Sequence, residues 1–152
     1  MIENTCCVTG HRNIRAARVP AIREQLEREI LFAVGAGYTR FISGFAEGCD
    51  LVFADLVAEM KRDLDLKLVA ALPYRNRFYS QNPMVQQLLR ACDEVYVISE
   101  QCTRQCYFQR NRWMVNESGR VIALYDGRDA GGTYYTVRCA QALQRQLRVV
   151  PI

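Results

Sequence analysis

The 152-residue sequence contains a single histidine, at position 11, and its seven cysteines are scattered along the chain. Only Cys102 and Cys106 stand at the i, i+4 spacing that places two thiols on one helix face, and a metal site would need further ligands near them. We therefore expect no metal. The cysteines within apolar stretches are expected to be small buried hydrophobes, namely Cys6, Cys7, Cys49, Cys92 and Cys139.

The sequence also lacks long apolar runs, repeats and low-complexity tracts. No run approaches the length of a membrane-spanning helix, and Glu3 stands where a secretion signal would carry positive charge. The net charge of +4 is a mild excess, which suits an anionic small molecule as well as DNA. Because 50% of the residues are hydrophobic, the chain can bury a core. We expect a cytoplasmic protein with one domain over residues 1–152 and no membrane partner.

Short apolar stretches alternate with amphipathic ones along the whole chain. The expected strands cover residues 5–9, 40–43, 67–72, 94–99, 121–125 and a short final stretch at 149–150. The expected helices cover about 20–35, 49–60, 84–91, 109–117 and 133–145, and residues 75–83 are expected to form a loop. This alternation favours right-handed crossovers between strands. The sequence therefore predicts an α/β fold, a Rossmann-like, doubly wound and mainly parallel sheet with helices on both faces.

In such a sheet the loops that follow the strands share the carboxyl edge, where ligands bind. Two of these loops combine glycine with a hydroxyl residue ahead of a helix, and another ends at Arg12. Helix-start N–H groups, hydroxyls and a guanidinium all suit a phosphate. The candidate binding residues are Thr9, Gly10, His11, Arg12, Ser43, Gly44, Gly48, Asp50, Pro73, Tyr74, Asp126, Gly131, Gly132 and Thr133.

None of these loops carries a standard nucleotide fingerprint. Residues 43–50 lack the pattern G-x-G-x-x-G, and the loop at Gly131 has no lysine ahead of Thr133. These absences disfavour an ordinary NAD dehydrogenase and a P-loop NTPase.

Several motifs, in order from residue 6 to about 142, carry a resemblance to a known superfamily. They are Val8-Thr9-Gly10-His11-Arg12, Ser43-Gly44 with Gly48 and Asp50, Pro73-Tyr74, Asp93-Glu94-Val95-Tyr96-Val97, Arg110-Asn111 with Met114-Val115, and Ala123-Leu124-Tyr125-Asp126-Gly127 with Gly131-Gly132-Thr133. With these motifs the sequence resembles the SLOG superfamily of Rossmann-like domains, specifically its YpsA-like branch of small bacterial and phage proteins.

The resemblance implies a pocket for a nucleotide or nucleotide-derived ligand. By the same resemblance, Gly10 and Arg12 would line the ligand, and Ser43 and Gly44 would contact its phosphate or ribose. The resemblance also implies a second phosphate cradle at Gly131-Gly132-Thr133. The superfamily includes Lonely Guy-type phosphoribohydrolases and DprA-like DNA-binding proteins.

One departure from the hydrolases bears on catalysis. The Lonely Guy enzymes resemble P-G-G-x-G-T-x-x-E, whereas Thr136 stands three residues after Thr133 in this chain. Glycosidic hydrolysis requires a carboxylate near the departing base or the attacking water. Glu47, Asp50 or Asp126 could substitute, but nothing in the sequence pairs them. We therefore place binding or sensing ahead of catalysis and assign no catalytic residue.

The sequence is compatible with two roles for several single residues. Asp50 could cap a helix or accept hydrogen bonds from ribose hydroxyls, and His11 could bind a ligand or serve the fold. The rings of Tyr74, Phe78 and Tyr79 could stack on a base or shield apolar surface. Trp113 is expected to pack inward.

Three functions from different classes follow. The first is the binding or sensing of a nucleotide-derived ligand, and the second is a nucleoside-monophosphate glycosidase. The third is a DprA-like binder of single-stranded nucleic acid, which the aromatic and basic residues of segment 107–113 suggest. Related folds often form homo-oligomers, so a homo-oligomer interface on leftover apolar surface is a further hypothesis.

Overall fold

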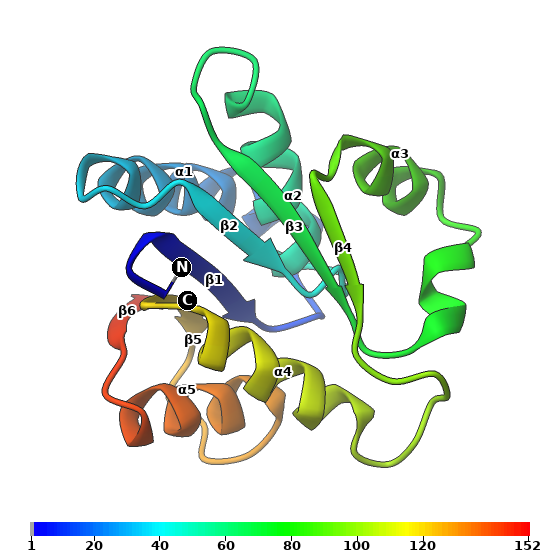
Figure 1. The fold of residues 1–152 in the computed structure, drawn as a ribbon. Coiled ribbons are helices and arrows are strands. Elements are labelled where there is room, and N and C mark those ends of the chain that lie inside the picture. Colours follow the sequence, from blue (N-terminus) through cyan, green and yellow to red (C-terminus); the bar gives the residue numbers. More distant parts are fainter. Residues whose placement is uncertain (1) are drawn as a thin grey trace.

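Six strands form one parallel sheet in the computed structural model, which describes residues 2–152 (Figure 1). The strands are β1 (Thr5–Gly10), β2 (Arg40–Ser43), β3 (Lys67–Leu72), β4 (Glu94–Val97), β5 (Arg120–Tyr125) and β6 (Gln146–Pro151). Their order in the sheet is β4-β3-β2-β1-β5-β6. β1 therefore lies between β2 and β5, and the chain winds outward in both directions from it. This arrangement confirms the doubly wound α/β fold.

Helices cover both faces of the sheet (Figure 1). They are α1 (Val19–Gly35), α2 (Cys49–Met60), α3 (Pro83–Ala91), α4 (Cys106–Glu117) and α5 (Gly132–Ala142), with 3-10 turns at Ile2–Asn4, Ala16–Arg18 and Arg75–Tyr79. Strand side chains alternate between the two faces, so Cys6 packs into the core under α1, α2 and α3, while Cys7 packs into the core under α4 and α5. The helices before β4 cover one face of the sheet and those after it cover the other. The change occurs because the connection from β4 through α4 leads back past β1 to β5.

The sequence placed most element boundaries within a few residues, and the largest differences lie near the C-terminus. The expected final helix to residue 145 ends instead at Ala142, where Gln144 takes a left-handed backbone conformation with φ 56°. The final strand is longer than expected and pairs with β5 from Gln146 to Pro151. β6 is an edge strand with mostly exposed side chains. It therefore lacks the continuous apolar run that predicts the inner strands from the sequence. Residues 75–79, expected as loop, form a 3-10 turn.

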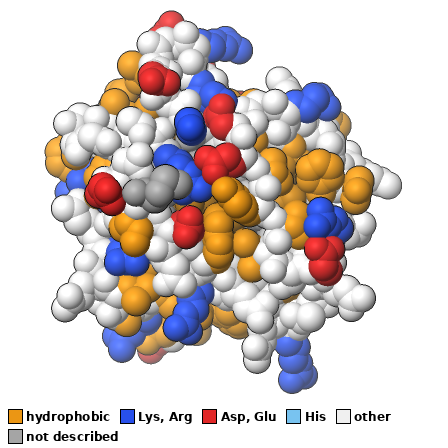
Figure 2. Space-filling view, in the orientation of Figure 1, with side chains coloured by type: hydrophobic (Ala, Val, Ile, Leu, Met, Phe, Trp, Pro, Cys, Tyr) orange, Lys and Arg blue, Asp and Glu red, His pale blue; other side chains and the backbone are white. Residues whose placement is uncertain are grey.

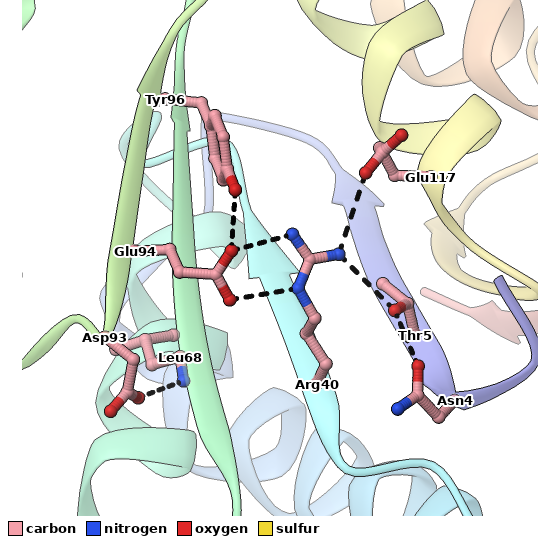
Figure 3. A network of polar contacts seen from close by, with 8 residues as sticks. All are labelled: Asn4, Thr5, Arg40, Leu68, Asp93, Glu94, Tyr96 and Glu117. Atoms are coloured by element: carbon pink, nitrogen blue, oxygen red, sulfur yellow. Dashed lines mark hydrogen bonds and ion pairs between the residues drawn. The ribbon is translucent and has the colours of Figure 1, made fainter. Parts of the chain in front are cut away.

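Buried charge at the amino edge of the sheet is neutralised within the protein (Figure 3). Arg40 begins β2 and is 3% exposed. Its guanidinium donates two hydrogen bonds of 3.1 Å to the carboxylate of Glu94 and lies 3.8 Å from Glu117. The Tyr96 hydroxyl donates to the same Glu94 carboxylate, at 2.7 Å. Arg40 therefore ties β2 to β4 and to α4 within a closed polar network.

Three observations concern metal binding and membrane insertion: the protonation of the cysteines, the grouping of possible metal ligands, and the length of the helices. Burial raises the pKa values of Cys7 and Cys49 to about 12, which keeps both thiols protonated. Among residues 2–152, no three His, Cys, Asp or Glu side chains are grouped as metal ligands would be. In the same part of the chain, no helix combines the length and the apolar character that a membrane crossing requires.

Candidate functional site

Two adjoining cavities open at the carboxyl edge, at the switch point between β1 and β5. The first has a volume of about 170 Å³ and lies between the loops that follow these strands. The second has a volume of about 200 Å³ and lies over the ends of β2 and β3. Arg12, Ala46 and Arg110 line both cavities, so the two form one continuous hollow. Parallel sheets bind their ligands at this kind of position.

Most of the candidate residues named from the sequence come together here. The first cavity is lined by Thr9, Gly10, His11, Arg12, Asp50, Gly131, Gly132 and Thr133, and the second by Gly44 and Pro73. The others lie near the same edge without lining either cavity, namely Ser43, Gly48, Tyr74 and Asp126. That these residues hold a ligand stays a prediction.

The Ser43 side chain forms hydrogen bonds within the loop that follows β2. Its hydroxyl donates to the Asp50 carbonyl at 2.8 Å and accepts from the Phe45 N–H at 3.2 Å. Ser43 is also fully buried. The hydroxyl thus joins the end of β2 to the first turn of α2 and holds the loop between them.

Gly10 and Gly48 allow protein segments to approach one another. A Cβ at Gly10 would lie 2.6 Å from the Cβ of Cys49, and one at Gly48 would lie 2.4 Å from the Arg12 carbonyl oxygen. Gly48 also has φ 83°, a backbone conformation that other residues rarely adopt. The loops after β1 and β2 therefore interlock, and the Cys49 N–H donates to the His11 carbonyl.

The glycines at the start of α5 differ from these two. A Cβ at Gly131 would meet no described atom within 4 Å, and one at Gly132 would meet only the Asn111 amide nitrogen, at 3.6 Å. Gly131 precedes α5 with φ 96°, and no side chain caps the helix. The free N–H groups of the first helical turn therefore open toward the first cavity.

Arg110 was not among the site residues predicted from the sequence, yet it lines both cavities. It is 3% exposed, and its Nη1 donates to the carbonyls of Gly44 and Ala71, at 2.6 and 3.2 Å. No carboxylate among residues 2–152 lies within ion-pair distance of this guanidinium. Burial lowers its pKa and the nearby Asp50 opposes that shift, but a guanidinium stays charged in proteins.

Further arginines surround the same hollow. The Arg12 guanidinium lies 4.5 Å from the centre of the Tyr107 ring, and it makes no ion pair with a carboxylate of residues 2–152. Arg77 lines the second cavity and donates to the Phe45 carbonyl at 2.8 Å. Arg128 lines the first and pairs with Asp126 at 2.5 Å. Arg12 was predicted from the sequence as a binding residue, whereas Arg77 and Arg128 were not, because an arginine in a sequence is equally typical of solvated surface.

Asp50 and Asp126 differ in how their charge is stabilised at this edge, where Glu47 also lines the second cavity. Burial raises the pKa of Asp50, which is 8% exposed, and the charge of Arg110 opposes that shift. Its carboxylate accepts a hydrogen bond from the Ala46 N–H at 3.2 Å. Hydrogen bonds from Arg128 hold the pKa of Asp126 well below its usual range. Burial thus disfavours the charge of Asp50, whereas Arg128 stabilises the charge of Asp126.

His11 lies beside this second carboxylate. Its Nε2 is 3.5 Å from the Asp126 carboxylate, and this nitrogen is buried without a hydrogen-bond partner among residues 2–152. Burial lowers the pKa of His11, Arg128 lowers it further, and Asp126 opposes both. The imidazole is therefore held in its neutral form near neutral pH.

Thr136 contributes no acid or base to the cavity. It is 2% exposed, and its hydroxyl donates to the Gly132 carbonyl at 2.9 Å, one helical turn back. Its side chain therefore belongs to α5 itself.

A Rossmann-like sheet with a basic cavity at its switch point defines the structural class of this protein. The chain belongs to the YpsA (YspA SLOG) family, whose model matches residues 6–150. The resemblance carried by the sequence motifs is thereby confirmed. No functionally curated protein matches the sequence.

Solved structures of low sequence identity share the fold. DNA processing protein A from Streptococcus pneumoniae is 16% identical, with a TM-score of 0.73 over 97% of this chain and 50% of its own. DNA processing protein A from Helicobacter pylori, described with a single-stranded DNA binding mode, is 21% identical, with a TM-score of 0.70 over 99% and 66%. TM1055 is 17% identical, with a TM-score of 0.59 over 95% and 72%. The chain spans about half to two thirds of the two DNA processing proteins.

Proposed function

We propose that this protein binds a small nucleotide-derived anion in the hollow between β1 and β5. The observation that carries the proposal is the set of arginines there that lack a carboxylate partner among residues 2–152. Arg40, at the opposite edge, is equally buried and has Glu94 and Glu117 beside it. Arg12 and Arg110 have no such partner. Arg110 is buried and Arg12 is exposed, and the positive charge of each would be stabilised by a bound anion.

The two cavities suggest how such a ligand would lie. A phosphate suits the first cavity, where the N–H groups of α5 and Arg128 converge. A base suits the second cavity, where Pro73 and Tyr107 supply apolar and aromatic surface. Arg12 and Arg110 lie where the two parts of the ligand would join.

Binding without catalysis fits the state of Thr136. A phosphoribohydrolase would need a carboxylate beside the reacting bond, and the Thr136 hydroxyl is already engaged within α5. The second candidate, a nucleoside-monophosphate glycosidase, is favoured by one observation, the raised pKa of Asp50 in the wall of the first cavity. Release of free base by the purified protein, abolished in Asp50→Asn, would establish that candidate in place of pure binding.

Thermal unfolding in the presence of AMP, ADP-ribose, NAD, cyclic nucleotides, adenosine and inorganic phosphate tests the proposal. A bound nucleotide at one hundred times its Kd should stabilise the fold by about 2.7 kcal/mol. Adenosine should stabilise it less, because it lacks the phosphate.

Two variants and one control make the screen specific. Arg12→Gln removes an exposed cation of the hollow, and Gly132→Asp places a carboxylate at the start of α5, where a side chain has room. Both should lose the ligand-dependent stabilisation. Arg15→Gln removes an exposed arginine that lines neither cavity and should keep it. The proposal is wrong if no phosphorylated compound stabilises the protein, or if both variants respond like the unaltered chain.

A further inference from the structure

A second surface, separate from the hollow at the switch point, lies on the outer side of α4 and α5. One depression of about 650 Å³ is lined by Arg104, Gln105, Phe108, Gln109, Arg112 and Tyr135. A neighbouring one of about 470 Å³ is lined by Tyr134, Tyr135, Arg138, Cys139 and Ala142. Tyr135 belongs to both, so they form a continuous groove along the seam between the two helices, the α4–α5 groove.

The aromatic side chains of the α4–α5 groove include one exposed ring, that of Phe108, and two half-buried tyrosines. Phe108 is 43% exposed, and its ring lies 4.7 Å from that of Tyr135 at an interplanar angle of 65°. The two rings come from different helices and meet over the seam. They offer flat surface to which a further ring can stack.

The charges of the groove are all of one sign. Arg104, Arg112 and Arg138 line it, and no Asp or Glu does. Within the described residues none of the three arginines pairs with a carboxylate, and neither do Arg62 and Arg90 elsewhere. Four arginines on other surfaces do, namely Arg23, Arg28, Arg75 and Arg148. In Figure 2, the lower part of the face, over α4 and α5, carries several basic and few acidic side chains.

We infer that the α4–α5 groove binds single-stranded nucleic acid, with bases stacked on Phe108 and Tyr135 and phosphates held by the flanking arginines. The exposed Phe108 ring, the half-buried Tyr135 ring and the flanking arginines supply the two contacts that unpaired strands need. A duplex keeps its bases stacked inside, so the rings would find no partner there. This inference goes beyond the proposed small-ligand function, because it uses another surface and a polymer.

A second copy of this chain fits the groove poorly. A two-fold interface places the same patch against itself, so Arg104, Arg112 and Arg138 would face their own copies without a carboxylate between them. Such a contact of like charges opposes association. A polyanion relieves the same repulsion.

Fluorescence anisotropy with a labelled oligothymidylate of about 20 nucleotides tests the inference on the full chain. Phe108→Leu keeps an apolar side chain but removes the ring, and it should weaken binding about tenfold. The double variant Arg104→Gln with Arg138→Gln should reduce the slope of log K against log salt by about 1.4, the value for two lost phosphate contacts on a single strand.

Matched controls separate the groove from general effects. Arg62→Gln with Arg90→Gln removes the same charge from exposed positions elsewhere, and Tyr79→Leu removes a ring that is 66% exposed outside the groove. Both should leave the affinity within about twofold of the unaltered chain. Arg12→Gln should do the same, because the small-ligand hollow is a different site.

Competition identifies the chemistry of the occupant. Unlabelled single strands should displace the probe, whereas polyglutamate of equal charge and duplex DNA should do so at least about tenfold less well. Equal competition by polyglutamate, equal losses in the control variants, or loss of binding in Arg12→Gln alone would each overturn the inference. So would self-association that depends on Phe108 without any binding of strands.

Discussion

Gly44 demonstrates how a glycine at a ligand edge can serve the protein's own packing. A Cβ there would lie 2.6 Å from Nη1 of Arg110 and 2.9 Å from a carboxylate oxygen of Asp50. The glycine therefore lets a buried cation and a buried carboxylate approach the same stretch of backbone from two sides. The sequence pattern Ser-Gly marks a tight turn, but the reason for the glycine lies on α4, 66 residues further along the chain.

Substitution of Gly44 by alanine should destabilise the fold by about 1–3 kcal/mol, because the added methyl group displaces Arg110 from its hydrogen bonds. Chemical denaturation measures the loss. Gly35→Ala is the matched control, since a Cβ at Gly35 meets nothing within 4 Å, and it should be neutral or slightly stabilising. Equal stability of the two variants would contradict the close packing described for Gly44.

At the scale of the element, the start of α5 combines two glycines with different requirements. Gly131 has φ 96° and ψ 177°, a conformation available almost only to glycine, yet it has free space around it. Gly132 begins the helix, has no positive φ, and faces the first cavity. Gly131 is required by its backbone conformation, whereas Gly132 leaves space beside the start of the helix.

Gly131→Ala should therefore cost about 1–3 kcal/mol of stability through backbone strain alone. Gly132→Ala should change stability by no more than about 0.5 kcal/mol, because its Cβ has only an ordinary contact at 3.6 Å. Thermal or urea unfolding of the pair provides the comparison. If the two alanines prove equally costly, the helix start does not have the conformation described.

The molecule as a whole divides its charges between the two edges of the sheet. At the amino edge Arg40 is matched by acidic partners (Figure 3), and at the carboxyl edge arginines surround an open hollow with Asp50 inside it. Arginines without a carboxylate partner among residues 2–152 therefore lie at the carboxyl edge, where we propose the anion site. The DNA processing proteins share this fold at 16% and 21% identity.

The single histidine makes the pH dependence of stability simple to test. The pKa of His11 is lowered in the folded state from its ordinary 6.5, so its contribution is complete above about pH 6.5 and is lost as pH falls through the folded value. Asp50 acts in the opposite direction, because its raised pKa makes protonation on acidification favourable to the fold.

His11→Asn should lose less stability than the unaltered protein between pH 7.5 and pH 5.5, with urea denaturation at both pH values as the measurement. Asp50 is present in both proteins, so the difference isolates the histidine. Identical pH profiles would mean that His11 titrates alike in the folded and unfolded chain.

The sequence by itself determined the alternation of strands and helices and the edge on which the glycine loops meet. Local patterns suffice there, because inner strands such as β3 are continuous apolar runs and α1 buries one stripe of its surface. It placed the end of α5 and the start of β6 less well, since an exposed edge strand lacks that pattern.

Only the tertiary structure decided which charges lack partners. Whether Arg110 is buried, and whether Arg40 meets Glu94 while Arg12 meets no carboxylate of residues 2–152, depends on segments distant in sequence that packing brings together. The same holds for the α4–α5 groove, which exists because Phe108 and Tyr135 meet across two helices. The hydrophobic periodicity of a sequence indicates which face of a helix or strand is apolar. It does not indicate which side chain of another element packs against that face.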